Sequence, residues 1–210
     1  MMHYLPSIAG VAVLSILITR TLIPMSHLMG LLDRPSERKA HMGTIPIIGG
    51  VSIYLSVVIG SVAFLELPET FIGVALICGL VTFIGALDDR NPLHAAYRLI
   101  VQLMAGVAIA SIGIKVATLG DLFALGNLQL GLLAIPFTAI AITGLCNAYN
   151  MVDGIDGLAG GLTLVSMGSL LFLTLGKAPE SETLLLAFLC TSILIFLVFN
   201  LTLRSKIKIF

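Results

Sequence analysis

The chain has 210 residues, of which 58% are hydrophobic and 10% are charged, and its mean hydropathy is +1.11. A soluble domain carries about 25% charged residues, so this composition excludes an ordinary water-soluble globule; the high hydrophobicity equally excludes a disordered chain. The 11 basic and 11 acidic residues cancel, which leaves no electrostatic footprint for nucleic acid. The sequence therefore predicts a protein that resides in a lipid bilayer.

Seven apolar segments are candidates for membrane-spanning helices, because about 20 apolar residues cross the hydrocarbon core as a helix. In chain order, the predicted spans are Tyr4–Ile23, Ile45–Leu65, Phe71–Leu87, Leu99–Ile114, Gln129–Cys146, Leu158–Leu175 and Leu184–Leu203. No internal repeat and no low-complexity linker divides the sequence. We therefore predict an all-α, polytopic membrane protein with seven transmembrane helices in a single membrane domain, residues 1–210.

The distribution of positive charge predicts the orientation of these spans. By the parity of the crossings, one side of the membrane holds the segments 24–44, 88–98, 147–157 and 204–210. That side, with the end of the first span, carries nine lysines and arginines, whereas the opposite side carries Lys115 and Lys177. Because basic residues are enriched in cytoplasmic loops, we expect these segments in the cytoplasm and the N-terminus outside.

The first cytoplasmic loop, residues 24–44, combines positive charge with turn-forming residues. It contains the stretch Asp33-Arg34-Pro35-Ser36-Glu37-Arg38-Lys39-Ala40-His41, and Gly49-Gly50 follows it. Arginine binds phosphate through a two-pronged fork and lysine binds it as a point charge. Membrane orientation alone also explains basic residues at this position. Taken alone, the loop favours orientation over phosphate binding.

The second loop begins with two adjacent carboxylates, Asp88 and Asp89, which Arg90 follows. Carboxylates at the end of a span are costly near hydrocarbon unless a cation or a shared proton neutralises them. Alternatively, the two side chains simply face water at a helix end. The aspartate pair by itself leaves both interpretations open.

The third loop is more informative and reads Asn147-Ala-Tyr-Asn150-Met-Val-Asp153-Gly-Ile-Asp156-Gly. A spacing of three residues places Asn147, Asn150 and Asp153 near one face of a helical turn, and the two glycines permit turns that bring Asp156 toward the same point. Carboxylate and amide oxygens suit Mg²⁺, which usually also binds substrate phosphates. A plain turn between two spans is the alternative. With the aspartate pair on the same side, these residues are typical of a metal-assisted phosphoryl-transfer site.

Together these motifs resemble the polyprenyl-phosphate N-acetylhexosamine-1-phosphate transferases of the glycosyltransferase 4 family, in particular the bacterial UDP-GlcNAc:undecaprenyl-phosphate GlcNAc-1-phosphate transferases. The resemblance covers nearly the whole chain and rests on Asp33-x-Pro-x-x-Arg38-Lys39-x-His41, on Asp88-Asp89-Arg90 and on Asn147-x-x-Asn150-x-x-Asp153-Gly-Ile-Asp156-Gly-Leu158. It implies that undecaprenyl phosphate attacks the β-phosphorus of a UDP-N-acetylhexosamine and releases UMP, with Mg²⁺ or Mn²⁺ bridging the diphosphate. The resemblance further implies that this reaction is the first lipid-linked step of cell-envelope polysaccharide synthesis, at the cytoplasmic face of the bacterial inner membrane.

The resemblance also implies roles for individual residues. Asp88 and Asp89 would position or deprotonate the lipid phosphate, and Asn150, Asp153 and Asp156 would contribute to the metal and nucleotide site. Candidate substrate-binding residues are Arg38, Lys39, His41, Arg90, Arg98, Asn147 and Asn150. Because a lipid phosphate is already largely ionised at neutral pH, we expect charge neutralisation to matter more than proton removal. The family commonly forms dimers, so a homodimer is compatible with the resemblance.

One departure from the family pattern concerns the end of the sequence. Family members, with ten or eleven helices, continue past the Phe-Asn of the seventh span into a Met/Leu-Gly-Asp motif that supplies a principal metal ligand. Here Phe199-Asn200 and a basic tail are present, and the sequence stops at Phe210. It matches the N-terminal two-thirds of the family's transferase domain. We therefore expect a truncated member that is inactive or severely impaired alone.

Two other classes of membrane protein share parts of this pattern. The signature of the CDP-alcohol phosphotransferases also begins with Asp-x-x-Asp-Gly, but it needs Ala-Arg shortly afterwards, where this chain has Gly160-Gly161, and further aspartates, whereas the next acidic residue is Glu180. A transporter-like bundle would carry ionisable residues along a pathway within its spans, whereas the acidic pairs here lie in loops on one side. The transferase is favoured, and a non-catalytic membrane fragment or transporter-like bundle is the alternative.

Overall fold

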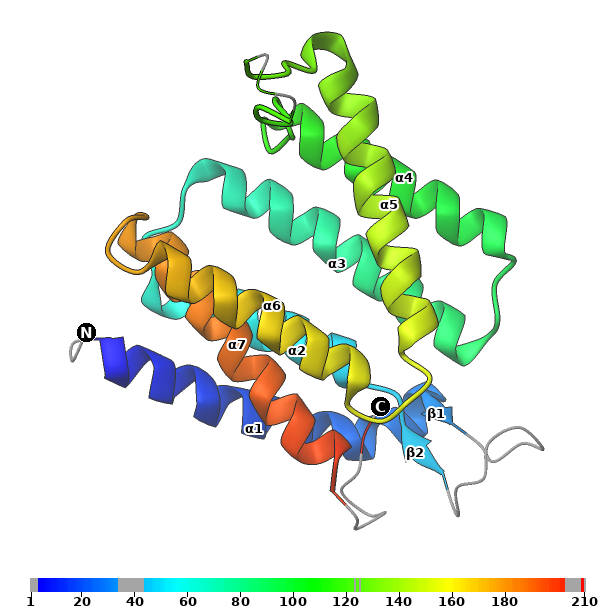
Figure 1. Cartoon of the computed structure of the whole chain (residues 1–210). Coiled ribbons are helices and arrows are strands. Elements are labelled where there is room, and N and C mark those ends of the chain that lie inside the picture. Colours follow the sequence, from blue (N-terminus) through cyan, green and yellow to red (C-terminus); the bar gives the residue numbers. More distant parts are fainter. Residues whose placement is uncertain (1–3, 34–43, 123, 125, 203–208, 210) are drawn as a thin grey trace.

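The computed structural model describes residues 4–33, 44–122, 124, 126–202 and 209. Over these residues the chain forms seven α-helices, one two-stranded hairpin and a short 3-10 turn (Figure 1). In order, the elements are α1 (Leu5–Met29), β1 (Leu32–Asp33), β2 (Ile45–Pro46), α2 (Gly49–Phe64), α3 (Glu69–Arg90), α4 (Ala95–Ser111), η2 (Gly131–Leu133), α5 (Ala134–Val152), α6 (Leu158–Thr174) and α7 (Glu180–Asn200). Each predicted span corresponds to one of these helices, which confirms the all-α class.

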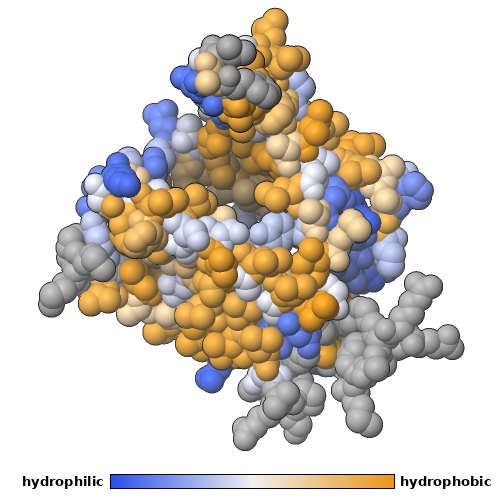
Figure 2. Space-filling view, in the orientation of Figure 1, coloured by the Kyte–Doolittle hydropathy of each residue, from blue (hydrophilic) through white to orange (hydrophobic). Residues whose placement is uncertain are grey.

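The lengths and surfaces of the helices are those of a polytopic membrane protein. Within the described ranges, α1, α3, α7 and the continuous stretch of η2 and α5 have 21 to 25 residues and are apolar enough to cross a membrane. The helices α2, α4 and α6 are apolar but shorter, with 16 or 17 residues. Figure 2 shows apolar side chains over most of one face, with polar residues mainly toward its edges. Large apolar residues exposed in this way are suited to contact with lipid.

The hairpin occupies a place where the sequence predicts helix. The second predicted span starts at Ile45, but Ile45 and Pro46 form β2, which pairs antiparallel with β1. The N–H of Ile47 extends this contact by donating to the carbonyl of Leu31 at 3.0 Å. Proline has no N–H and pushes the residue before it out of the helical region. Helix α2 therefore begins only at Gly49.

Three helices run further than the sequence predicts. Helix α5 continues past Cys146 to Val152, so Asn147 and Asn150 are helical and the predicted segment 147–157 is a connection only from Asp153 onward. Helix α1 continues through Pro24 to Met29 and ends at Gly30, whose φ of 71° is the left-handed conformation that glycine tolerates at such an end. Helix α3 continues through the aspartate pair to Arg90, a residue whose charge is favourable at a helix C-terminus. Asp88 and Asp89 therefore lie in the last turn of α3 and not in a loop, which corrects the predicted segment 88–98.

The helices form two groups that α3 connects (Figure 1). In the first group α1, α2 and α7 pack against one another, and α6 packs on α7. In the second group α4 packs closely along α5, while α3 contacts both α2 and α4. The close crossing of α4 and α5 depends on Gly106 of α4, because a Cβ at this position would lie 2.7 Å from the Cα of Ala139 on α5. The two groups therefore meet across α3, which carries the aspartate pair.

Three connections lie at one end of the molecule. The β1–β2 hairpin, the α3–α4 connection and the α5–α6 connection are at the right of Figure 1, and the N-terminus and the α2–α3 and α6–α7 connections are at the left. Asp88 and Asp89 lie at the end of α3, and Asn147, Asn150 and Asp153 lie at the end of α5, so the fold gathers these two polar motifs at a single end of the bundle.

Candidate active site

A cavity of about 430 Å³ lies where the ends of α2, α3, α4 and α5 meet. Its polar lining includes Asp88 and Asp89 from α3, Arg98 and Gln102 from α4, Tyr149 and Asn150 from α5, and Asp153 directly after α5. Gly49 and Gly50, at the start of α2, form part of its wall. Residues from separate stretches of the sequence thus surround one space.

A second and larger cavity, of about 820 Å³, lies between α2, α3 and α7. Its lining is mainly aliphatic and aromatic, with Glu66 and Glu182 among the few charged members. None of the site residues predicted from the sequence contributes to it. The smaller cavity is therefore the candidate for chemistry.

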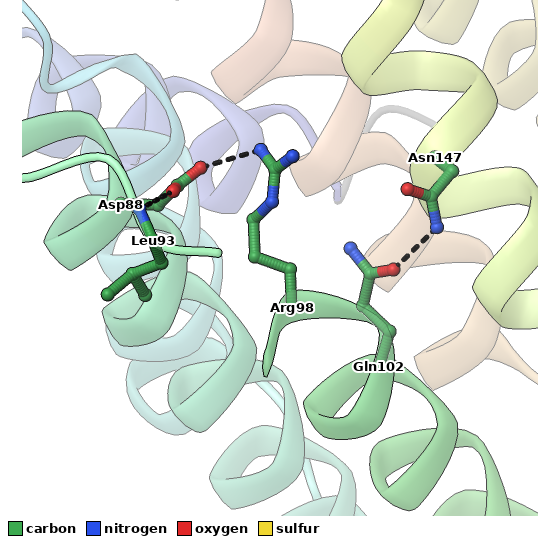
Figure 3. A network of polar contacts seen from close by, with 5 residues as sticks. All are labelled: Asp88, Leu93, Arg98, Gln102 and Asn147. Carbon is green, nitrogen blue, oxygen red and sulfur yellow. Dashed lines mark hydrogen bonds and ion pairs between the residues drawn. The ribbon is translucent and has the colours of Figure 1, made fainter. Parts of the chain in front are cut away.

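Asp88 is held at the wall of the smaller cavity by two hydrogen bonds (Figure 3). Its Oδ2 accepts from Nη1 of Arg98 at 2.7 Å, and its Oδ1 accepts from the backbone N–H of Leu93 at 2.7 Å. The side chains of Asp88 and Arg98 are 17% and 30% exposed. The two opposite charges thus compensate each other in a half-buried setting. A cation neutralises this carboxylate, which was one of the two interpretations that the sequence left open.

Asn147, a predicted substrate-binding residue, contacts α4 and does not line the cavity. Its Nδ2 donates to Oε1 of Gln102 at 2.7 Å and to the carbonyl of Thr143 at 2.9 Å (Figure 3). Gln102 lines the cavity instead and is absent from the motifs that the sequence singles out. Its signal in the sequence is its place four residues after Arg98, which puts both side chains on one face of α4.

The last turn of α5 brings Asn150 and Asp153 to the cavity. The N–H of Asp153 donates to the carbonyl of Tyr149 at 3.0 Å, so Asp153 ends the helix. Partial desolvation by the surrounding chain, and next the negative charge of Asp156, raise the pKa of Asp153. Asp156 lies near enough to exert this effect but is not part of the cavity lining. Of Asn147, Asn150 and Asp153, which were expected on one face, only Asn150 and Asp153 line the cavity.

The donors at the end of α5 fit a hard divalent cation that shares its coordination with a ligand. Asn150 and Asp153 line the cavity with an amide and a carboxyl side chain, and Asp156 adds a second negative charge nearby. Across the described parts of the chain, no three His, Cys, Asp or Glu side chains gather closely enough to hold a metal ion. Mg²⁺ uses one or two carboxylates and completes its coordination with water and phosphate oxygens. The donor set thus suits Mg²⁺ bound together with a phosphate, and not a closed structural metal site.

The remaining predicted residues lie elsewhere. The guanidinium of Arg90 lies against the end of α1, where its Nε is 3.4 Å from the position that a Cβ of Gly30 would occupy, and Arg90 does not line the cavity. Arg38, Lys39 and His41 lie outside the described residues. The cavity therefore unites five of the predicted residues, and it adds Gln102 and Tyr149, which were not predicted. The five are Asp88, Asp89, Arg98, Asn150 and Asp153.

The comparison with known families agrees with the motifs in this cavity. The sequence model of the family described as "Glycosyl transferase family 4" matches residues 71–210, which is more than half of the chain. The chain belongs to glycosyl transferase family 4. The matched range includes the aspartate pair on α3 and the whole of the Asn-Asp motif at the end of α5.

Named relatives of this family 4 chain come from several bacteria. A Yersinia pestis protein named "Undecaprenyl-phosphate alpha-N-acetylglucosaminyl 1-phosphate transferase" is 36% identical over 183 residues, which cover 85% of the chain and 49% of the relative. An Escherichia coli K12 protein of the same name is 37% identical over 145 residues, covering 68% of the chain and 39% of the relative. The chain thus spans half or less of the length of these two curated relatives.

Proposed function

We propose that this chain serves in the transfer of an N-acetylhexosamine-1-phosphate, with GlcNAc-1-phosphate as the first choice, from a UDP-sugar to undecaprenyl phosphate with release of UMP. The observation that carries the proposal is the cavity in which Asp88, Asp89, Arg98, Asn150 and Asp153 come together at one end of the bundle. The relatives' names supply the lipid and the sugar phosphate. Such a cavity offers cations, amides and carboxylates to two phosphate groups.

The two members of the aspartate pair have different parts in this proposal. Asp88 is already paired with Arg98 and bound to the N–H of Leu93, so its part is to fix the guanidinium at the cavity wall. Asp89 lines the same wall, and we assign it to positioning the attacking lipid phosphate. Because that phosphate is largely ionised at neutral pH, positioning and charge compensation contribute more than removal of a proton.

Asn150 and Asp153, with Asp156 beside them, are the residues that would hold Mg²⁺ or Mn²⁺. When bound, the cation supplies a Lewis acid that neutralises charge on the diphosphate. Partial desolvation, and next the like charge of Asp156, raise the pKa of Asp153. The repulsion between the two carboxylates supports this assignment, because a divalent cation removes it. Asn150 then acts as a neutral oxygen donor that orients the ligand without adding charge.

The setting that we propose is the bacterial inner membrane, with the cavity on the cytoplasmic side and the N-terminus outside. The bias of nine basic residues against two supports this orientation. The gathering of the three polar connections at one end of the bundle agrees with it. The lipid phosphate then approaches from the bilayer and the UDP-sugar from the cytoplasm.

Transfer of radiolabelled GlcNAc-1-phosphate tests the proposal directly. Membranes that contain the protein expressed from its own gene are supplied with labelled UDP-GlcNAc and undecaprenyl phosphate. We expect label in the lipid extract and release of UMP, both abolished by EDTA and restored by Mg²⁺. The variant Asp89→Asn should transfer the label at a rate at least about 100-fold lower, which is the effect of removing a group that stabilises charge in an active site.

The matched control for that assay is Asp121→Asn, which makes the same change in the long connection between α4 and α5 and should leave the rate unchanged. A normal rate in Asp89→Asn, or full activity in EDTA, would contradict the proposal. The same assay on the isolated 210-residue chain tests the expectation that it is inactive or severely impaired alone. Robust Mg²⁺-dependent release of UMP by that chain would refute this expectation.

A further inference from the structure

The polar face of α4 continues past Arg98 to Gln102, a residue without an assigned role. The two side chains are four residues apart on one face of the helix, and both line the cavity. In Figure 3 they lie between Asp88 on one side and Asn147 on the other. Gln102 therefore stands between the aspartate wall and the α5 wall of the cavity.

Asn147 determines which way the amide of Gln102 faces. An amide nitrogen only donates, so Gln102 must turn its Oε1 toward the Nδ2 of Asn147, which is 2.7 Å away. The same Nδ2 also donates to the carbonyl of Thr143 at 2.9 Å, which holds the Asn147 side chain against α5. The Nε2 of Gln102 is left on the opposite side, toward Arg98 (Figure 3).

Within the described residues, the amide nitrogen of Gln102 thus donates no hydrogen bond. It lies on the face of α4 that also carries the guanidinium of Arg98. Much of the charge of Arg98 is compensated by Asp88 at 2.7 Å. A neutral N–H donor beside a compensated cation suits an anionic oxygen, because a hydrogen bond to a charged acceptor is stronger than one to a neutral acceptor.

We propose that Gln102 binds a phosphate oxygen of the substrate through its Nε2–H, and that Asn147 acts on the substrate through Gln102 by orienting this amide. The inference rests on the proposed transferase function and adds a binding residue to it. The phosphate oxygen belongs either to the lipid phosphate or to the diphosphate of the UDP-sugar. The shared chemistry is the same, and the experiment distinguishes the two sources.

Two isosteric variants test the proposal in the purified protein expressed from its own gene. Gln102→Glu keeps an acceptor for Asn147 but replaces the donor with a carboxylate that repels phosphate. Asn147→Asp replaces the donor with an acceptor, so the Gln102 amide turns over and its oxygen faces the cavity. Both variants should weaken binding of a phosphate ligand by about tenfold or more, the usual effect of losing a hydrogen bond to a charged group.

The measurement is the Kd, by calorimetry in the presence of Mg²⁺, for farnesyl phosphate and for UDP-GlcNAc. The matched control is Gln129→Glu, which makes the same change at an exposed residue outside the cavity and should leave both constants unchanged. Gln102→Met, neutral and similar in size, provides a second variant if the charged one fails to fold. Gln102→Met should weaken binding of the same ligand by a smaller factor than Gln102→Glu does, because methionine removes the donor without repelling phosphate.

A loss confined to farnesyl phosphate supports binding of the lipid phosphate, and a loss confined to UDP-GlcNAc supports binding of the diphosphate. Unchanged constants for both ligands in the Gln102 variants overturn the proposal. Weaker binding in those variants with normal binding in Asn147→Asp overturns the orienting role of Asn147. If the unaltered protein binds neither ligand, the transferase function itself is contradicted, which is a different result from a failure of the variants alone.

Discussion

Asp153 has a raised pKa because it is partly desolvated and lies near the negative charge of Asp156. The folded state therefore holds the proton of Asp153 more tightly than the unfolded chain does. The free energy of unfolding consequently falls as the pH rises from the pKa of an unfolded aspartate to the higher pKa of Asp153 in the folded state. We predict that Asp153→Asn raises the unfolding temperature at neutral pH in the absence of divalent cations. The gain should shrink as the pH falls toward about 4, where an ordinary aspartate takes up its proton.

Thermal unfolding of the two proteins in detergent, at a series of pH values with EDTA, measures this difference. Asp121→Asn serves as the control for loss of a carboxylate far from the cavity. An unfolding temperature of Asp153→Asn that is lower than that of the unaltered protein at neutral pH would contradict the predicted sign. The carboxylate would then stabilise the fold, and its place beside Asp156 would need another explanation.

The ion pair of Asp88 and Arg98 gives a second prediction at the scale of residues. Arg98→Met removes the cation and leaves a half-buried carboxylate whose remaining recorded partner is the N–H of Leu93. We expect a loss of about 1 to 3 kcal/mol in the free energy of unfolding. Adding Asp88→Asn should recover part of this loss, because a neutral amide needs no counter-charge, while transferase activity stays low. Denaturant unfolding of the single and double variants measures this recovery. A double variant no more stable than Arg98→Met would refute the prediction that Asp88 needs the charge of Arg98.

At the scale of elements, the crossing of α4 and α5 sets the separation of two cavity walls. A Cβ at Gly106 would lie 2.7 Å from the Cα of Ala139, and backbone cannot move aside as a flexible side chain does. We predict that Gly106→Ala destabilises the protein by about 1 to 3 kcal/mol, despite the better helix propensity of alanine, because the helices must separate.

The matched control is Gly144→Ala on α5, where an added Cβ meets nothing within 4 Å. It should be neutral or slightly stabilising. Denaturant unfolding of both variants gives the comparison. Equal stabilities of Gly106→Ala and Gly144→Ala would show that the crossing tolerates a wider separation than its backbone contact indicates.

The number and order of the helices were predictable from apolar segments, but several of their ends were not. Hydropathy ends the third span at Leu87, whereas α3 runs to Arg90 because partners on the α3–α4 connection and on α4 satisfy Asp88. Hydropathy also starts the second span at Ile45, where pairing with β1 gives a strand. Both differences come from tertiary contacts that a one-dimensional pattern does not contain.

The residues of the cavity were likewise only partly predictable from the sequence. The motifs predicted Asp88, Asp89, Asn150 and Asp153, since charged and amide residues at the ends of apolar spans are conspicuous in the sequence. They did not predict Gln102, because a single glutamine within an apolar helix carries no motif. Asn147 was assigned to the substrate because its spacing matches the other members, but spacing does not reveal that α4 lies against that side of α5.

At the scale of the whole molecule, the orientation in the membrane is open to a direct test. Asn91, in the α3–α4 connection, and Lys177, in the α6–α7 connection, are both exposed and lie toward opposite ends of the bundle. In a cysteine-free version of the chain, we predict that a membrane-impermeant thiol reagent labels Lys177→Cys in intact spheroplasts. It should label Asn91→Cys only after the membrane is permeabilised. The reverse pattern would contradict the positive-inside assignment, and equal labelling of both would contradict the number of crossings between them.

The pair of Asp88 and Arg98 also has a consequence for how the protein enters the membrane. Asp88 lies in the last turn of α3, Arg98 lies in the first turn of α4, and Leu93 lies in the connection between them, so their contact requires only α3 and α4. A neutral pair is less costly at the membrane boundary than two separate charges. We expect helices α3 and α4 to leave the translocon with the contact between Asp88 and Arg98 already formed. The contact of Gln102 with Asn147 must wait for α5, so the cavity is assembled in the order of synthesis.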